Sequence, residues 1–215
     1  VVGDVEPESV ADIAREVLGT EHKDAGVKLQ DWSEPMTCVV PEAAANMEVA
    51  MPMFSLAFKA EPVDRGDAGI RTEMVADLAA EALFGESSGL YLKMYEAGII
   101  DSSFGGGFET IDGCAMLMCS GDSEEPCAVR DAIIAQAAKL AEEGIPEKDF
   151  LRMKRSALGR RIRSLDSFDA TCFRLCAYHL TEFDYFQFPR IHESVTAEEV
   201  RRFLAETIQR DNCAL

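Results

Sequence analysis

The amino-acid sequence predicts an α+β fold, in which a mainly antiparallel sheet carries helices packed on one face. Short apolar segments bounded by proline or glycine, which are typical of strands, lie in the first 120 residues. Longer segments with apolar residues at spacings of three and four indicate amphipathic helices. Their order is strand, helix, two strands, two helices, a hairpin and then a cluster of helices. This order is typical of an α+β protein.

The chain begins with a predicted strand and helix. Residues 1–5 contain three valines, which favours a strand that is already under way at residue 1. Pro7 suits the start of a helix, because its missing N–H would have no partner there. Apolar residues then recur on one face until Gly19, which is a natural helix stop. Residues 20–35 are polar and are expected to form a loop.

Two strand candidates and two helices follow. Residues 39–40 form a short strand candidate, and residues 53–60 form a stronger one because prolines bound it on both sides. A long helix is predicted from residue 66 until Gly85 breaks it. A second helix follows, and the serines at 87–88 are interpreted as capping residues rather than as a nucleophile.

A hairpin comes next. Residues 102–110 and 114–120 are its two predicted strands, and residues 111–113 form a plausible turn. The first strand contains three consecutive glycines at 105–107. No Lys-Ser/Thr pair follows them, so a bulge or a close approach of neighbouring atoms is favoured over a phosphate-binding loop.

The remainder of the chain is predicted to be almost entirely helical. The expected helices span about 127–142, 147–164, 168–182 and 196–209. Residues 212–215 are expected to begin a final strand.

The formal net charge is −18, from 39 acidic and 21 basic residues. Such a chain repels phosphate backbones, so no nucleic-acid partner is expected. Basic residues at 152–163 alternate with apolar ones and are interpreted as a solvated helix face. No apolar run approaches the ~18 residues that span a bilayer, so no membrane partner is expected. The seven cysteines, without a repeated C-x-x-C, do not predict a disulfide framework, and a cytoplasmic location is expected.

Three histidines are present, and two of them begin incomplete zinc motifs. His179 begins H-x-x-E and His192 begins H-E-x-x, but each motif lacks the second histidine that a shared metal needs. No catalytic residue and no metal ligand is therefore predicted. Cys172, Cys176 and His179 share one helical face, for which core packing is favoured and an independent metal-binding module is the minor alternative.

Several segments resemble the pitrilysin/insulinase family of zinc metallopeptidases, in wording closest to a bacterial branch. The opening VVGDVEPESV, residues 1–10, resembles the start of the second domain in each half of these proteins. Residues 83–104, LFGESSGLYLKMYEAGIIDSSF, resemble the family segment in which a helix leads into a strand near the substrate cleft. Parts of 150–167 resemble the later helices, and residues 196–200 resemble the last one. The resemblance runs from end to end of the chain, in order.

The resemblance implies an accessory role. In this family each half pairs two similar α+β domains, two halves close into a chamber, and zinc lies in the first domain of a half on H-x-x-E-H plus a distal glutamate. The chain matches only the second domain. Residues 1–215 are therefore expected to form a single non-catalytic domain of a larger peptidase, with zinc in the preceding domain and no cofactor in this chain. The expected partners are the remaining domains of the parent or a homologous subunit, and a peptide substrate.

The resemblance also places three candidate residues near substrate. An active partner half often carries an arginine and a tyrosine in the helix-to-strand segment, where this chain has Tyr95 and Asp101. Direct assistance to the transition state is not expected, and Tyr95, Asp101 and Phe104 are predicted at most to line the chamber. The net charge suggests a chamber wall that disfavours acidic peptides, although the charge could equally lie on the outer surface.

The predicted function is that of a chamber-forming, substrate-supporting domain of a zinc-dependent metalloendopeptidase, not catalytic by itself. The alternative is a scaffold subunit of a catalytically inactive family member that partners an active peptidase. The two alternatives differ in the preceding domain, which lies outside these residues.

Overall fold

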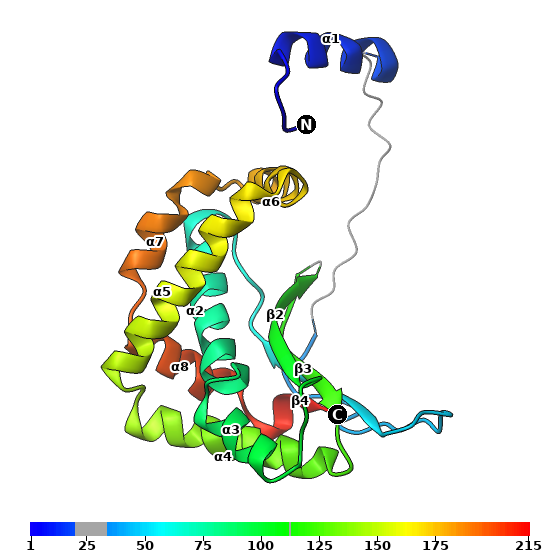
Figure 1. Ribbon diagram of the computed structural model, residues 1–215, viewed down its shortest axis with the longest axis vertical. Helices are drawn as coiled ribbons and strands as arrows, with labels where there is room; N and C mark the ends of the chain where they lie inside the picture. The colour runs from blue at the N-terminus through cyan, green and yellow to red at the C-terminus, as the bar shows by residue number, and fades with distance from the viewer. Residues whose placement is uncertain (20–33, 112) are drawn as a thin grey trace.

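The computed structural model describes residues 1–19, 34–111 and 113–215. Its centre is an antiparallel sheet of four strands in the order β2-β3-β1-β4. The strands are β1 (Met53–Ala60), β2 (Gly105–Ile111), β3 (Cys114–Asp122) and β4 (Cys213–Ala214). Helices α2 and α8 pack on one face of this sheet (Figure 1). The predicted α+β class is confirmed.

The helices are α1 (Pro7–Leu18), α2 (Gly66–Phe84), α3 (Gly89–Glu96), α4 (Pro126–Glu143), α5 (Glu147–Arg163), α6 (Phe168–Leu180), α7 (Phe188–Ser194) and α8 (Ala197–Thr207). Short 3-10 turns lie at Ser164–Asp166, Tyr185–Gln187 and Arg210–Asn212. Among the described residues, no helix is both long enough and apolar enough to cross a membrane.

The core forms where the inner face of the sheet meets α2. Alternate residues of β1 point toward the helices, and Leu56 and Phe58 are fully buried there. Each such side chain contributes about 1.5–3 kcal/mol when it is removed from water. From α2, Met74 and Leu78 lie one helical turn apart and meet this face. Since α2 also contacts α5, α7 and α8, it is the central helix of the fold.

Local side-chain hydrogen bonds fix where two helices begin. Ser88 precedes α3; its Oγ accepts from the Tyr91 N–H at 3.0 Å and donates to the Leu83 carbonyl at 2.9 Å. Capping, predicted for this serine pair, is confirmed. Thr196 and Glu199 form a capping box at the start of α8. The guanidinium of Arg71 on α2 donates to both carboxylate oxygens of Glu199, at 2.6 and 3.0 Å, which ties α8 to α2.

The strongest sequence patterns gave accurate boundaries. The strand at 53–60, the long helix from residue 66 and the final strand are confirmed. The hairpin is confirmed as well, with Ile111 opposite Cys114, although Asp112 in its turn lies outside the described residues. Gly113 has φ +85°, a conformation that glycine adopts without strain. The predicted loop at 20–35 also lies largely outside the described residues.

Two predicted strands are wrong. Residues 1–5 form a bend and not a strand, and Val1 and Val5 are exposed. Valine favours a strand when a neighbouring strand and a buried face are present, and residues 1–5 have neither among the described residues. Residues 39–40 make no ladder, although nearby the Cys38 N–H donates to the Asp211 carbonyl and the Leu215 N–H donates to the Pro41 carbonyl. A proline at position 41 has no N–H with which to continue such a ladder.

Two helical segments also differ from the expectation. Helix α1 has the predicted bounds, but none of its residues is buried, so its apolar face packs on nothing among the described residues. Helix α7 was not predicted. It has only seven residues, too few for a helical period to stand out, and its Pro189 lies in the first turn, where proline is tolerated.

Candidate functional site

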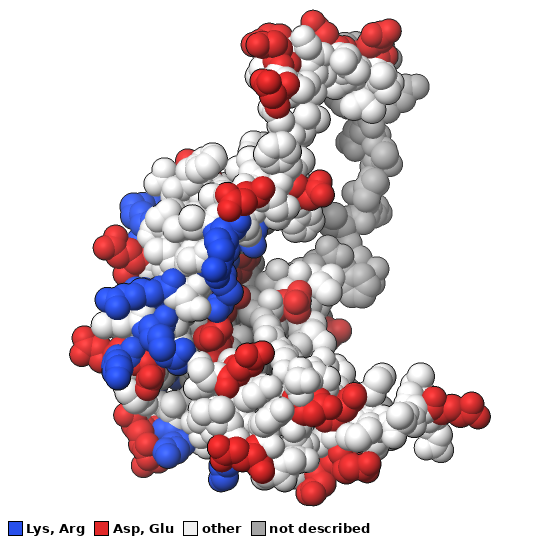
Figure 2. Space-filling view, viewed as in Figure 1, with Lys and Arg blue, Asp and Glu red and all other residues white. Residues whose placement is uncertain are grey.

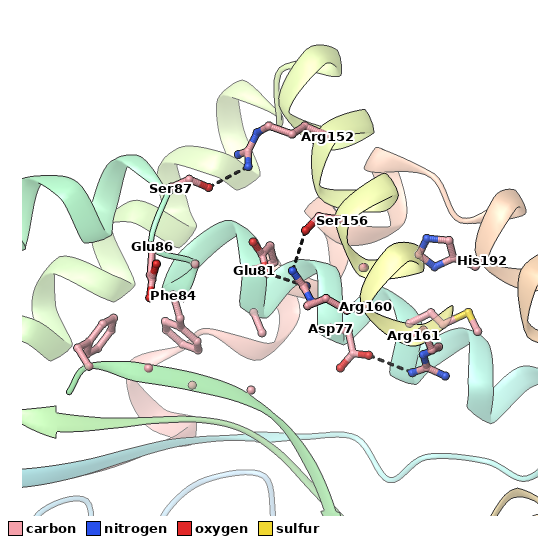
Figure 3. Close-up of a pocket in the computed structure, with 18 of the residues that line it drawn as sticks. Asp77, Glu81, Phe84, Glu86, Ser87, Arg152, Ser156, Arg160, Arg161 and His192 are labelled. Carbon is pink, nitrogen blue, oxygen red and sulfur yellow. Dashed lines mark hydrogen bonds and ion pairs between the residues drawn. The ribbon is translucent and has the colours of Figure 1, made fainter. Parts of the chain in front are cut away.

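A groove of about 760 Å³ opens beside the sheet. Its floor is α2, one wall is β2 and the opposite wall is α5, and side chains from α6 and α7 reach its far end (Figure 3). The elements that line it are therefore far apart in sequence and are brought together only by the fold. The loop between α2 and α3 closes the near end.

The β2 wall is an edge strand. It pairs with β3 on one side, and no other strand of the described residues pairs with its second side. Gly105, Gly106 and Gly107 line the groove at the start of this strand. A Cβ on Gly106 would lie 2.7 Å from atoms of both Cys119 and Phe84, so this residue has to be glycine for β2 to pack here. The close approach predicted for the glycine run is confirmed at this position.

The α5 wall presents arginines at helical spacing. Arg152, Ser156 and Arg160 are four residues apart and lie on one face of the helix. The Arg152 guanidinium donates to the Ser87 hydroxyl at 2.9 Å, across the near end of the groove. Arg160 donates to the Ser156 hydroxyl at 2.8 Å and to a carboxylate oxygen of Glu81 at 2.9 Å (Figure 3). The wall is thus polar and fixed by hydrogen bonds.

The far end of the groove holds a partly buried ion pair. Arg161 donates to Asp77 at 3.3 Å and to the Tyr178 hydroxyl at 3.1 Å, and its side chain is only 16% exposed. Burial raises the pKa of Asp77, although the neighbouring guanidinium groups oppose that rise. Burial also lowers the pKa of His192, whose Nε2–H donates to the Lys154 carbonyl at 3.0 Å, so this imidazole is neutral at pH 7.

The three residues predicted to line the chamber have different positions. Phe104 is 5% exposed, packs against Phe84 and lines the groove with its buried ring. Tyr95 is 50% exposed, stacks on Tyr91 and does not line the groove. Asp101 is exposed and caps a turn, where hydrogen bonds from the Ser103 hydroxyl and backbone N–H lower its pKa. Their role at a chamber wall stays a prediction.

The described residues do not fit a zinc ion. They contain no group of three or more His, Cys, Asp or Glu side chains that could hold a metal. His179 is exposed, and the second-ligand position of its motif is Phe183, which is buried in the core. His22 lies outside the described part of the chain. No catalytic step can therefore be derived through a metal bound to these residues.

All seven cysteines are free thiols. Cys119 and Cys213 are buried in the sheet, whereas Cys127 on α4 and Cys176 on α6 are exposed. The interpretation of the α6 cysteines as core residues is wrong, because α6 has no buried residue and Cys172 is only partly covered.

Sequence reasoning missed the arginines of the groove. The basic run of α5 was interpreted as a solvated face, yet Arg152, Arg160 and Arg161 line the groove and Arg161 is largely buried. The four-residue spacing of Arg152, Ser156 and Arg160 was the available signal. Arg174 on α6 had no signal in the sequence, since only the tertiary fold brings it to the groove.

The chain is thus an α+β domain with a groove beside its sheet, and its described residues hold no group of side chains that could bind a metal ion. The family model described as "Peptidase M16 inactive domain" matches residues 1–157. The chain belongs to this family, as the inactive domain of M16 peptidases, which confirms the predicted membership in the pitrilysin/insulinase metallopeptidases.

Individual relatives agree with this assignment. The chain is 27% identical over 214 residues to "Uncharacterized zinc protease YmfH" of Bacillus subtilis strain 168, covering 98% of this chain and 50% of that protein. It thus spans about half the length of this curated relative. An M16-like peptidase from Alicyclobacillus acidocaldarius has the same fold with a TM-score of 0.86 at 20% identity, covering 98% of this chain and 51% of that one. A protease from Helicobacter pylori superposes with a TM-score of 0.82 at 14% identity, over 99% of this chain and 52% of that one.

Proposed function

We propose that this chain, residues 1–215, is one non-catalytic domain of a larger zinc-dependent metalloendopeptidase, in which it forms part of the chamber wall and holds an extended stretch of the peptide substrate. The observation that carries this proposal is the groove beside the free edge of β2. Tyr95, Asp101 and Phe104 are proposed to line the chamber next to this groove. The zinc and the bond-breaking chemistry belong to the preceding domain of the parent.

An edge strand beside a groove favours strand addition. The N–H and C=O groups on the free side of β2 have no strand partner among the described residues, and an extended peptide can supply one. The seven residues of β2 span about 23 Å at ~3.3 Å per residue, so six or seven residues of peptide fit alongside. Main-chain bonding of this kind accepts many sequences, as a peptidase for unfolded or short peptides requires.

The proposed parent follows from the comparisons. The chain covers half of a relative whose name includes "zinc protease", and about half of two solved peptidase structures. The missing half is the proposed place of the zinc domain and the proposed principal partner of this chain. The seven free thiols support a reducing compartment, and we propose the cytoplasm.

N-methylated peptides test the strand addition. A peptide added to an edge strand uses the N–H of every second residue, so methylation of one alternate set should abolish binding and methylation of the other set should leave it unchanged. Binding of fluorescent heptapeptides to the full chain would be measured by anisotropy. Equal affinity for both methylation patterns would exclude strand addition at β2.

Zinc analysis of the parent protein tests the proposed accessory role in a zinc peptidase. The accessory role predicts bound zinc and peptide cleavage that a chelator abolishes. A parent with neither zinc nor cleavage would instead be the scaffold subunit of an inactive family member.

A further inference from the structure

We infer that the groove selects acidic peptides, with the peptide backbone on β2 and its carboxylates facing the arginines of α5 and α6. This inference rests on the proposed strand addition and adds a substrate class to it. The expectation drawn from the net charge of the whole chain is the opposite one.

The charge of the groove differs in sign from that of the chain. Although the chain carries a net charge of −18, the groove is lined by four arginines and three carboxylates. Figure 2 shows most Lys and Arg side chains of this face gathered over the helical side around α5, with acidic side chains among them and over the rest of the face. The residues involved are Arg152, Arg160, Arg161, Arg174, Asp77, Glu81 and Glu86.

Two of the four arginines already have a carboxylate partner inside the groove. Arg160 pairs with Glu81 at 2.9 Å, and Arg161 pairs with Asp77 at 3.3 Å. Both carboxylates belong to α2, the floor, so these pairs lie beneath the space that a peptide would occupy. These two pairs stabilise the wall, and the ligand preference depends on the charged side chains of the groove that have no such partner.

Arg152 and Arg174 retain donors for a ligand. Among the described residues, Arg152 pairs with one carboxylate, that of Asp149 at 3.9 Å, and this exposed pair contributes little. The Arg174 side chain makes no hydrogen bond or ion pair with the described residues. Among the described residues, Glu86 is the one carboxylate lining the groove that has no ion pair. Two arginines therefore stand against one free carboxylate, and the unpaired charge in the groove is positive. A guanidinium has five N–H donors and no acceptor, and a carboxylate is its strongest complement.

The spacing of the arginines sets the peptide pattern. Arg152 and Arg160 are eight residues apart on α5, which is about 12 Å along the helix axis. Arg174 lies at the Arg160 end, since both guanidinium groups lower the pKa of the same residue, Asp77. An extended chain covers about 12 Å in roughly four residues, and residues i and i+4 point to the same face of a strand. A peptide with Glu at i and i+4 therefore matches the two ends of the groove.

The distant acidic surface does not cancel this preference. At 0.15 M salt, charges on the surface are screened beyond about 8 Å, whereas arginines in contact with the peptide are screened much less. Local contacts thus decide the affinity under these conditions.

The test compares three heptapeptides of equal length on the full chain at 0.15 M salt. One has Glu at i and i+4, the second has Gln at both positions, and the third has Glu at i and i+3, with the same charge on opposite faces. We expect the first peptide to bind about tenfold more tightly than the Gln peptide and about threefold more tightly than the third. Equal affinities for the first two peptides would overturn the inference.

Matched arginine variants locate the effect. Arg152→Gln and Arg174→Gln each remove one of the two contacts, so each should weaken binding of the first peptide about threefold and leave binding of the Gln peptide unchanged. Arg155→Gln is the control, because Arg155 is exposed on α5, does not line the groove and makes the same change in net charge. An equal loss in all three variants would show a general charge effect and overturn the inference.

The two proposals fail in different ways. If the Gln and Glu peptides bind alike and both remain sensitive to the N-methylation pattern, the acidic preference is wrong and strand addition stands. If no peptide is sensitive to that pattern, strand addition is wrong, and the acidic preference that rests on it is wrong too.

Discussion

Gly106→Ala is expected to destabilise the protein because β2 touches its neighbours there without room for a methyl group. The added Cβ would collide with the carbonyl oxygen of Met118 and lie 2.7 Å from both the Cβ of Cys119 and a ring carbon of Phe84. Cys119 is directly opposite Gly106 in the ladder, so relief requires a shift of β3 or of α2. Overpacking of this kind costs about 1–3 kcal/mol, and we expect a loss of about 2 kcal/mol.

Gly107→Ala is the matched control. No atom lies within 4 Å of a Cβ built on Gly107, and the two variants have the same composition. Removing glycine from a strand interior favours the folded state by roughly 0.5 kcal/mol, so this variant should be as stable as the parent or slightly more. Urea unfolding followed by circular dichroism measures both, with the slope checked for constancy. If the two variants unfold at the same urea concentration, the packing argument for Gly106 is refuted.

Two further predictions concern helix ends. Burial alone would raise the pKa of Glu199, but hydrogen bonds from Arg71 and Thr196 outweigh it and lower the pKa from 4.5 to about 2, which corresponds to about 3 kcal/mol of stability at neutral pH. Because the folded-state pKa is lowered, this stability is present above pH 4.5 and is lost as the pH falls toward 2. The Glu199→Gln variant should be less stable than the unmodified protein at pH 7 and should lose less stability on acidification. Parallel pH profiles of stability for the two proteins would contradict this. Ser88→Ala removes the N-cap of α3 and should cost about 1 kcal/mol, measured as a lower thermal midpoint, whereas Ser87→Ala, outside the cap, should cost less than half as much.

The sequence predicted the elements whose signal is local. Strand 53–60 was located to the residue because prolines bound it and its buried residues alternate with more exposed ones. The Ser88 cap and the glycine-rich strand were equally local features. By contrast, the valines at 1–5 favoured a strand that does not form, since strand formation depends on a partner that no short segment encodes.

The groove could be predicted only in part. Phe104 was placed near substrate by family resemblance, and the structure puts its ring against the groove. The arginines that give the groove its charge come from α5 and α6, which β3 and α4 separate from β2 in the sequence. The spacing of residues within α5 does not show which element of the fold that face of the helix will meet. Net charge was misleading for a related reason, because a sum over the chain contains no information about how the charges are distributed in space.

Because the cysteines differ in exposure, two of them can be labelled selectively with dyes. Burial raises the pKa of Cys119 to about 12 and that of Cys213 to about 11, so neither thiol reacts at neutral pH. Cys127 and Cys176 are open to a maleimide dye, and their helices, α4 and α6, lie at opposite ends of the helical layer (Figure 1). Once the three partly covered cysteines are replaced by serine, a donor and acceptor dye on this pair would follow the spacing of the two ends by energy transfer. Such a pair would show directly whether the two ends of the helical layer move relative to each other when a peptide enters the groove.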